Sequence, residues 1–380
     1  MGVAPVTTQT PDHQHQPAAG GQRAAIVGTG FMGRVHANAV RAAGGRVVGI
    51  VGSSRERAEL ARAHLGADQA FATLPELIDS VDVDTVHVCT PNHLHEPVVQ
   101  VALAAGKHVV CEKPLALDVA AATAMTEAAS SAGRVATVPF VYRFHPVVRE
   151  ARERVRRGDL GQISLAHGSY LQDWLLYPSD DNWRVDPGLG GPTRAFGDIG
   201  SHWCDLLEFV TGDRIDAVCA RTATVNQRRG DPQPRAVATE DVVTMQFTTA
   251  GGALGSVVVS QVSPGRKNRL LLEVSGAQAT LSFDQENPET LWWGGRENSA
   301  VLVRDPDTLS APAARYALVP AGHPQGYQDC FNAFAADTAA AVRGESPDGL
   351  PTFADGLRAT RIATAVVTSA VDGSWVEVGG

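Results

Sequence analysis

Three side chains in two distant segments have the types and spacing that proton transfer requires. Lys113 lies in the string Cys111-Glu112-Lys113-Pro114, where a proline ends a short apolar stretch that we expect to be a strand. Asp198 and His202 are four residues apart in an expected helix, so both should share a face with Asp205. A carboxylate one turn from an imidazole can fix its tautomer and make it a general base. With a lysine, such a pair could take a hydroxyl proton while a hydride leaves the carbon.

Each of these residues also has a structural interpretation. Asp198 could be a helix cap, and His202 could be a hydrogen-bonded core histidine. Packing alone explains Lys113 poorly, because ligands of a doubly wound sheet bind outside the carboxyl ends of its strands. We therefore take Lys113, Asp198 and His202 as the candidate catalytic residues.

A glycine-rich loop indicates what would accept the hydride. The loop follows the apolar stretch Ala25-Ile26-Val27 and opens an expected helix. In this setting the first glycine permits a tight turn, the second admits a pyrophosphate, and the third allows close packing of helix and sheet. The strand, loop and helix together predict dinucleotide binding. The candidate cofactor-binding residues here are Gly28, Thr29, Gly30, Phe31, Met32 and Gly33.

The end of the second expected strand bears on the choice between NAD and NADP. NAD enzymes usually place an acid there, on the ribose 2′-hydroxyl, whereas this chain has Ser53, Ser54 and Arg57. Hydroxyls and a guanidinium suit a 2′-phosphate, so the sequence favours NADP(H) over NAD(H). Alternatively, Arg57 lies at the start of a helix and has no contact with the cofactor. Glu56 leaves open that the protein uses both NAD(H) and NADP(H).

The elements that must position these residues fall into two groups. From Arg23 to about Phe140, β-branched stretches alternate with alanine-rich helical ones, which predicts a parallel sheet with helices on both faces. The expected strands are 24–28, 46–51, 85–89, 108–111 and 135–139. The expected helices are 32–43, 55–65, 74–78, 95–105 and 118–132.

After a helix near 147–157 the pattern changes, because strand-like stretches now follow one another. This is typical of a mostly antiparallel sheet. The expected strands are 163–171, 217–225, 241–247, 253–261, 269–275, 279–283 and 375–378, with helices at 198–210 and 353–369. The fold class is therefore α/β, with an α+β second domain. We place a disordered tail at residues 1–21, the cofactor domain at 22–143 and the substrate-binding and oligomerisation domain at 144–380.

Composition excludes several other classes of function. The formal net charge is -9, which argues against nucleic acid or an anionic membrane surface as a partner. The sequence has no run of about 18 apolar residues that could span a membrane, and residues 1–21 lack the apolar core of a signal peptide. Five widely spaced cysteines include no C-x-x-C pair, which indicates neither a zinc site nor a disulfide framework and suits the cytoplasm.

The long segment from Gln172 to Phe196 is a candidate substrate loop. Trp174 could stack on a sugar ring, and Arg184 could bind hydroxyls or a phosphate. The alternative is that the tryptophans only pack against the rest of the protein and bind no ligand. Three aspartates in the loop argue against a strongly anionic substrate unless Arg184 and Arg194 point inward.

Together these strings resemble the Gfo/Idh/MocA oxidoreductases, the family of glucose–fructose oxidoreductase and inositol dehydrogenase. The likeness runs from about Arg23 to the C-terminus. It rests on the glycine loop, Cys111-Glu112-Lys113-Pro114, Thr90-Pro91-Asn92-His93-Leu94-His95, Tyr142-Arg143-Phe144 and the string DIGSHWCD at 198–205. It implies a Rossmann domain, a second domain with an open antiparallel sheet, and an active site between them. The open sheet would support a homodimer or homotetramer.

The resemblance also implies roles for single residues. Lys113 would lie by the nicotinamide, with His202 as the base and Asp198 as its partner. Thr90, Asn92, His95 and Glu112 would lie along the nicotinamide half of the cofactor. Tyr142 and Arg143 would lie close to the substrate, Arg143 also close to the cofactor.

The function expected from these observations is an NAD(P)-dependent oxidoreductase that interconverts a secondary alcohol and a ketone on a sugar or cyclitol. Three alternatives stay open: a keto-sugar reductase of a biosynthetic pathway, an NAD-dependent glycoside hydrolase, and a non-catalytic sugar sensor. The sensor is the least favoured, because it does not need Lys113, Asp198 and His202 together.

Overall fold

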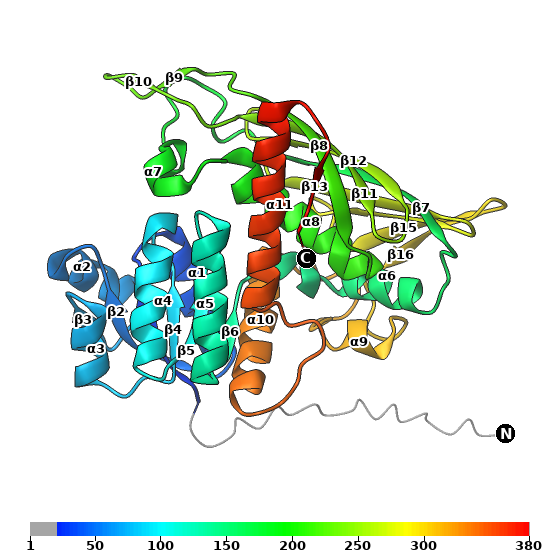
Figure 1. Ribbon diagram of the computed structural model, residues 1–380. Helices are drawn as coiled ribbons and strands as arrows, with labels where there is room; N and C mark the ends of the chain where they lie inside the picture. Colours follow the sequence, from blue (N-terminus) through cyan, green and yellow to red (C-terminus); the bar gives the residue numbers. More distant parts are fainter. Residues whose placement is uncertain (1–20, 380) are drawn as a thin grey trace, which may run out of the picture.

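The computed structural model describes residues 21–379, which form two sheets with their helices (Figure 1). The predicted tail lies outside the described residues, apart from Gly21. Among the residues described, no helix has both the length and the hydrophobicity of a membrane span.

The first sheet is parallel throughout, as predicted. Its strand order is β3-β2-β1-β4-β5-β6, so the order reverses beside β1, where ligands of such sheets bind. The strands are β1 Arg23–Val27, β2 Arg46–Val51, β3 Gln69–Phe71, β4 Thr85–Val88, β5 His108–Cys111 and β6 Ala136–Thr137. Its helices are α1 Phe31–Ala42, α2 Arg55–Leu65, α3 Leu74–Ser80, α4 His95–Ala104 and α5 Val119–Ala132, with a 3-10 turn η1 at Asn92–Leu94. Strand β3 was not predicted.

The second sheet has nine strands in the order β16-β15-β14-β13-β7-β12-β11-β8-β17. All neighbours are antiparallel except β7 and β12, so the prediction of a mostly antiparallel sheet is confirmed. The strands are β7 Ile163–Leu171, β8 Ile215–Ala223, β11 Val242–Thr249, β12 Leu254–Ser260, β13 Arg269–Gly276, β14 Thr280–Asp284, β15 Thr290–Gly294, β16 Ser299–Val303 and β17 Val376–Glu377. A separate small hairpin joins β9 Arg228–Arg229 to β10 Arg235–Ala236.

Helices cover one face of this sheet (Figure 1). These are α6 Pro146–Arg156, α8 Ser201–Thr211 and α11 Phe353–Asp372. Alternate residues of β13 and β14 are buried against them, around the fully buried Trp203. Two short helices, α7 Pro187–Gly190 and α9 Ala311–Ala314, lie in connections.

One helix of the second segment packs on the first domain. Helix α10, Tyr327–Val342, was not predicted, and it lies against α1. Its Phe331 and Phe334 join Val35 of α1 in one buried cluster. The predicted boundary between residues 143 and 144 falls inside the turn η2, Val141–Phe144, and remains a prediction.

Candidate active site

A cavity of about 910 Å³ lies at the carboxyl ends of the first-domain strands. Its lining brings most of the predicted cofactor residues together with parts of the second domain. The predicted residues that line it are Gly28, Thr29, Gly30, Phe31, Met32, Ser53, Arg57, Thr90, Asn92, Glu112, Lys113, Trp174, Arg184 and Asp198. Gly33, Ser54, His95, Tyr142, Arg143 and His202 are not among its lining residues.

The glycine loop fits a dinucleotide pyrophosphate. Gly28 has φ +117°, and a Cβ there would approach the carbonyl oxygen of Cys89 to 2.4 Å. A Cβ on Gly33 would meet the carbonyl oxygen of Gly28 at 2.2 Å, so Gly33 allows α1 to pack closely. Gly30 faces open space and caps α1 without a side chain, and the first turn of α1 has no acid. The positive end of the helix is therefore free to meet an anion.

At the end of β2 the predicted residues separate into two roles. Ser53 and Arg57 line the cavity. The side chain of Ser54 instead accepts a hydrogen bond from the amide of Arg57, at 3.2 Å, and caps α2. Arg55 pairs with Glu76 on the neighbouring helix α3. The hydroxyl of Ser54 thus has a structural role at the helix start, and its role as a cofactor contact stays a prediction.

His95 also has a structural role, and its predicted contact with the cofactor stays a prediction. It is fully buried, and its two ring nitrogens lie 2.9 Å and 3.1 Å from the carbonyl oxygens of Pro114 and Thr90. Burial lowers the pKa of His95. The ring thus joins the two loops that follow β4 and β5 and does not line the cavity. Asn92 does line it, and its amide donates to the carbonyl oxygen of Gly190 at 2.8 Å.

Glu112 supports the lysine from inside the first domain. Its carboxylate lies 2.9 Å from Nε2 of His36, and its other oxygen accepts from the amide of Lys113 at 3.2 Å. Burial alone would raise the pKa of Glu112, but the hydrogen bond and charge of His36 outweigh it, so the pKa lies below its ordinary value. Glu112 is a buried carboxylate that lines both the cavity and the second pocket described below.

Lys113 connects the two domains through Asp198. Its Nζ donates to Oδ1 of Asp198 at 2.8 Å and to the backbone oxygen of Asp198 at 2.9 Å. The second carboxylate oxygen accepts from Nε2 of Gln261 at 2.8 Å, and Nε of Arg184 lies 3.3 Å from Oδ1. Burial alone would raise the pKa of Asp198, but the charges of Lys113 and Arg184 outweigh it and hold the pKa well below its ordinary value. The carboxylate is therefore ionised at neutral pH.

His202 lines a second, adjoining pocket of about 290 Å³. Burial and the nearby charge of Lys113 lower its pKa well below the ordinary value, and the charge of Asp198 opposes them without prevailing. The ring is therefore neutral at pH 7. Its Nδ1 is buried without a hydrogen-bond partner among the described residues, which leaves Nε2 to meet a substrate. Its ring packs edge-on against Phe140 and Tyr142.

The predicted pairing of Asp198 with His202 is not formed. The hydrogen bonds of the Asp198 carboxylate within the described chain go to Lys113 and Gln261. Asp198 lies in a π-helical turn, η4 Phe196–Gly200, which precedes α8. A π-helical turn contains more residues than an α-helical one, so the face expected from regular helical spacing is broken.

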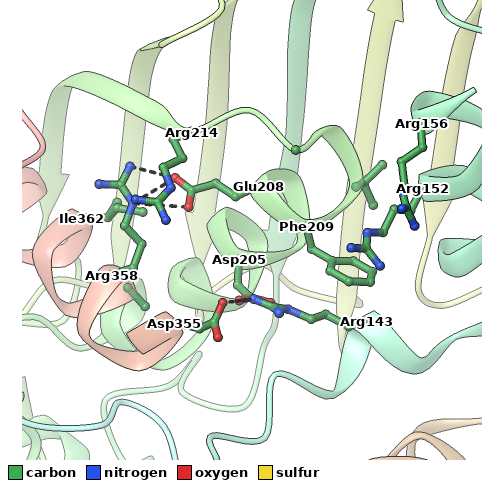
Figure 2. Close-up of a pocket in the computed structure, with 13 residues that line it drawn as sticks. Arg143, Arg152, Arg156, Asp205, Glu208, Phe209, Arg214, Asp355, Arg358 and Ile362 are labelled. Atoms are coloured by element: carbon green, nitrogen blue, oxygen red, sulfur yellow. Dashed lines mark hydrogen bonds and ion pairs between the residues drawn. The ribbon is translucent and has the colours of Figure 1, made fainter. Parts of the chain in front are cut away.

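Asp205 and Arg143 lie together in another cavity, of about 320 Å³, between α6, α8 and α11 (Figure 2). Nε of Arg143 donates to Oδ2 of Asp205 at 2.8 Å, and its Nη2 donates to Oδ1 of Asp355 at 2.8 Å. Burial raises the pKa of Asp205 to about 7 against the charge of Arg143. Arg143 lines neither of the two cavities described above, and its Nε and Nη2 donate to carboxylates, so its predicted contact with cofactor and substrate gains no support from this geometry and stays a prediction. Asp205 likewise does not share the site of Asp198 and His202.

The second pocket contains a polar network that the sequence did not reveal. The hydroxyl of Tyr142, a predicted substrate residue, hydrogen-bonds that of Tyr170 and accepts from Nδ2 of Asn268 at 3.0 Å. Oδ1 of Asn268 accepts from Nε2 of Gln172 at 2.8 Å. Tyr170 and Gln172 are two residues apart at the end of β7, so strand alternation was the one signal that could have found them. Lys267 and Tyr327 complete this lining.

The predicted substrate loop reaches both cavities. Arg184 lines both, and its guanidinium stacks on Trp183 at 4.4 Å from the ring centre. Trp174 lines the larger cavity, with its indole nitrogen donating to Oε1 of Gln172 at 2.8 Å. Arg194, in contrast, is fully buried against Asp241 and does not point inward.

Comparisons with known proteins agree with this geometry. A family model described as "Oxidoreductase family, NAD-binding Rossmann fold" matches residues 22–140, and the "GFO/IDH/MocA C-terminal domain" matches residues 148–282. Levoglucosan dehydrogenase of Pseudarthrobacter phenanthrenivorans is 31% identical, over 93% of this chain and 97% of that protein. Inositol 2-dehydrogenase 1 of Saccharopolyspora erythraea is 28% identical, over 94% of this chain and 96% of that protein.

A solved structure shows the same arrangement of domains. Levoglucosan dehydrogenase in complex with NADH and L-sorbose superposes on this chain with a TM-score of 0.88. The two are 30% identical, and the match covers 95% of this chain and 100% of that one. Both domains of the protein therefore have counterparts in a single known enzyme.

Proposed function

We propose that this chain, which belongs to the Gfo/Idh/MocA oxidoreductase family, is an NAD(P)-dependent dehydrogenase that interconverts a secondary alcohol and a ketone on a sugar or cyclitol. The observation that carries the proposal is the contact between Lys113 and Asp198. It lies where the dinucleotide-sized cavity meets the smaller polar pocket, and both residues line both spaces. A carbon held between the two cavities would have a proton-handling group on one side and the cofactor on the other.

Each residue has a distinct part in the proposed reaction. A nicotinamide dinucleotide bound in the larger cavity would supply the hydride acceptor for oxidation and the hydride donor for reduction. Lys113 uses two hydrogen bonds on Asp198, which leaves one N–H for the substrate hydroxyl oxygen. The neutral His202 takes the hydroxyl proton on Nε2 during oxidation and returns it during reduction. Asp198 fixes the lysine and balances its charge.

The polar pocket supports a small polyhydroxylated substrate. Its lining offers donors and acceptors from Tyr142, Gln172 and Asn268, and Trp174 lies half-exposed at the neighbouring cavity. Two relatives, levoglucosan dehydrogenase and inositol 2-dehydrogenase 1, are named for substrates of this class. The positive charges of Lys113 and Arg184 are matched in the lining by the carboxylates of Asp198 and Glu112, and Lys267 is paired with Asp173, so the pocket favours an uncharged substrate.

The test is a screen of monosaccharides, anhydrosugars and inositols with NAD⁺ and NADP⁺, following absorbance of the reduced nicotinamide. We expect at least one polyol to give stoichiometric reduced cofactor and the matching ketone. If a glycoside is cleaved while the cofactor returns unchanged, the chain is instead an NAD-dependent glycoside hydrolase. Turnover of a keto-sugar alone would identify a reductase.

We further propose that the site favours NADP(H). Ser53 and Arg57 line the cavity where an NAD enzyme would place a carboxylate. Ser53→Asp should shift the ratio of kcat/KM values toward NAD⁺ by about tenfold, because the new carboxylate would repel a 2′-phosphate and accept from a 2′-hydroxyl. A wild type that already prefers NAD⁺ tenfold would contradict the proposal.

The free face of the second sheet supports a homo-oligomer. The face opposite the helices exposes large apolar side chains on four strands, which a second copy could cover. These are Leu165, Leu254, Val258, Trp292, Val301 and Val303. We propose a homodimer or homotetramer formed through this face, and a monomer by sedimentation at micromolar concentration would contradict it.

A further inference from the structure

The small hairpin β9–β10 lies outside both large sheets and extends above α7 (Figure 1). This hairpin contacts the first part of the substrate loop, residues 172–186. The amide of Gly230 donates to the carbonyl oxygen of Pro178 at 3.0 Å, and Nδ2 of Asn226 donates to that of Leu176 at 3.1 Å. The hairpin is therefore fastened to the loop by its backbone and by side chains.

Arg229 holds the loop from the inside. Its side chain is fully buried, which is costly for a charge unless its donors are hydrogen-bonded. Both terminal nitrogens are bonded, and only Nε lacks a partner among the described residues. Nη2 donates to the carbonyl oxygen of Leu175 at 2.7 Å, and Nη1 donates to those of Tyr177 at 2.9 Å and Asp180 at 3.2 Å. A single guanidinium thus holds three carbonyl groups of the loop between Trp174 and Arg184.

Asp241 anchors Arg229 to the large sheet. Its Oδ1 accepts from Nη2 of Arg229 at 2.6 Å and also from Nη2 of Arg194, and all three side chains are fully buried. The backbone oxygen of Asp241 accepts from the amide of Gln261 at 3.1 Å, and the side chain of Gln261 holds Asp198. The loop and the catalytic carboxylate are therefore positioned from one point at the start of β11.

Arg235 holds the loop from the outside. Its Nη2 lies 3.0 Å from Oδ1 of Asp181, and its Nη1 lies 3.4 Å from Oδ2 of Asp186. The side chain is 41% exposed, so these ion pairs contribute little to the stability of the whole fold. They do tie β10 to the aspartates that flank Trp183 and Arg184.

We propose that the β9–β10 hairpin, acting through Arg229 and Arg235, is a clamp that sets the shape of the substrate pocket by holding the loop that carries Trp174, Trp183 and Arg184. The inference rests on the proposed dehydrogenase function for its kinetic readout. Arg229 and Arg235 are positioning residues, since neither lines the two cavities. Loosening the loop would misplace Trp174 and Arg184 while leaving Lys113, which lies on the other domain, where it is.

The test compares Arg229→Met, Arg229→Lys and Arg235→Met with a matched control, Arg228→Met. Arg228 is the neighbouring arginine of β9, and its side chain donates only within the hairpin, to the carbonyl oxygen of Pro234. We expect Arg229→Met to raise KM for the polyol by about tenfold with kcat changed less than about threefold. Arg229→Lys and Arg235→Met should raise KM by smaller factors, and Arg228→Met should leave it unchanged. The preference for the best polyol over a smaller one should also fall in the clamp variants.

A purely structural role gives a different result. Partial unfolding lowers the active fraction and hence the apparent kcat, but it does not change KM. Unchanged KM and unchanged substrate preference in Arg229→Lys and Arg235→Met would therefore overturn the proposal, even if Arg229→Met does not fold. Hydrogen exchange of a peptide spanning 173–190, followed by mass spectrometry, provides a readout without substrate. Exchange should accelerate in Arg235→Met and not in Arg228→Met, and equal rates would overturn the clamp. If the wild type oxidises no polyol, the proposed function fails while the exchange result still decides the inference.

Discussion

The two walls of the active cleft are built in different ways. The wall from the first domain consists of strand ends and the turns that follow them, so the glycine loop and Lys113 are positioned by the chain next to them. The wall from the second domain is a loop whose shape depends on Arg229, 54 residues after the Leu175 carbonyl that it binds. The first wall thus carries local motifs, and the second depends on long-range hydrogen bonds.

The most severe test of this contrast removes the functional group of the first wall. Lys113→Met should lower kcat by about 10³-fold, because the hydrogen-bond donor to the substrate oxygen and the partner of Asp198 are lost together. The Kd for reduced cofactor should stay within about threefold, since the glycine loop is unchanged. Stopped-flow kinetics and fluorescence titration measure the two quantities.

A matched control lies beside the other end of the same strand. Lys107→Met changes a lysine just before the opposite end of β5 and should leave both values at wild-type level. Near-normal turnover in Lys113→Met would show that the wall from the first domain does not contain the reacting group.

The second wall is tested by its histidine. His202→Asn should lower kcat by about 10²-fold, because asparagine cannot accept the hydroxyl proton. The pH dependence of the wild type provides a further check. Oxidation needs the neutral ring, and the pKa of His202 lies well below 6.5, so this group stays unprotonated and active as the pH falls through 6.5. The acid limb of kcat/KM for oxidation should therefore have no midpoint near 6.5, and a His202-dependent midpoint there would contradict the account.

The smallest catalytic effect is expected at Asp205, which the sequence placed beside His202 and the structure places elsewhere. Asp205→Asn should leave kcat within about twofold, because the residue lines neither of the two cavities that hold the reaction. It should lower the free energy of unfolding by about 2 kcal/mol, since the buried Arg143 would keep only the partly exposed Asp355 as a charged partner. A tenfold loss of kcat with unchanged stability would return Asp205 to the active site.

What the sequence could predict follows from the same contrast. The strand, glycine loop and helix around Gly28, and the display of Lys113 at the end of β5, depend on neighbouring residues, and the parallel sheet was predicted from them correctly. The partner of Asp198 could not be predicted, because Lys113 is 85 residues away and the π-helical turn alters the helical spacing. Arg143 stands next to Tyr142 in sequence but turns to the opposite side, toward Asp205 and Asp355.

Missed elements have a similar cause. Helix α10 buries polar residues such as Asp337, which accepts from the hydroxyl of Tyr316 at 2.6 Å, so its apolar pattern is weak. The hairpin strands β9 and β10 have two residues each and are rich in arginine, which no apolar alternation can reveal. Their role depends on what Arg229 touches, and the sequence does not contain that information locally.

The central claim is that a hydride passes between a carbinol carbon, held beside Lys113 and His202, and the nicotinamide. It is tested most directly with the polyol found by the screen, carrying deuterium on the carbon that is oxidised. The account predicts that wild-type enzyme yields one deuterium on the reduced cofactor per ketone formed, and that Lys113→Met yields about 10³-fold less in the same time. Ketone formed by the wild type without deuterium in the cofactor would contradict it.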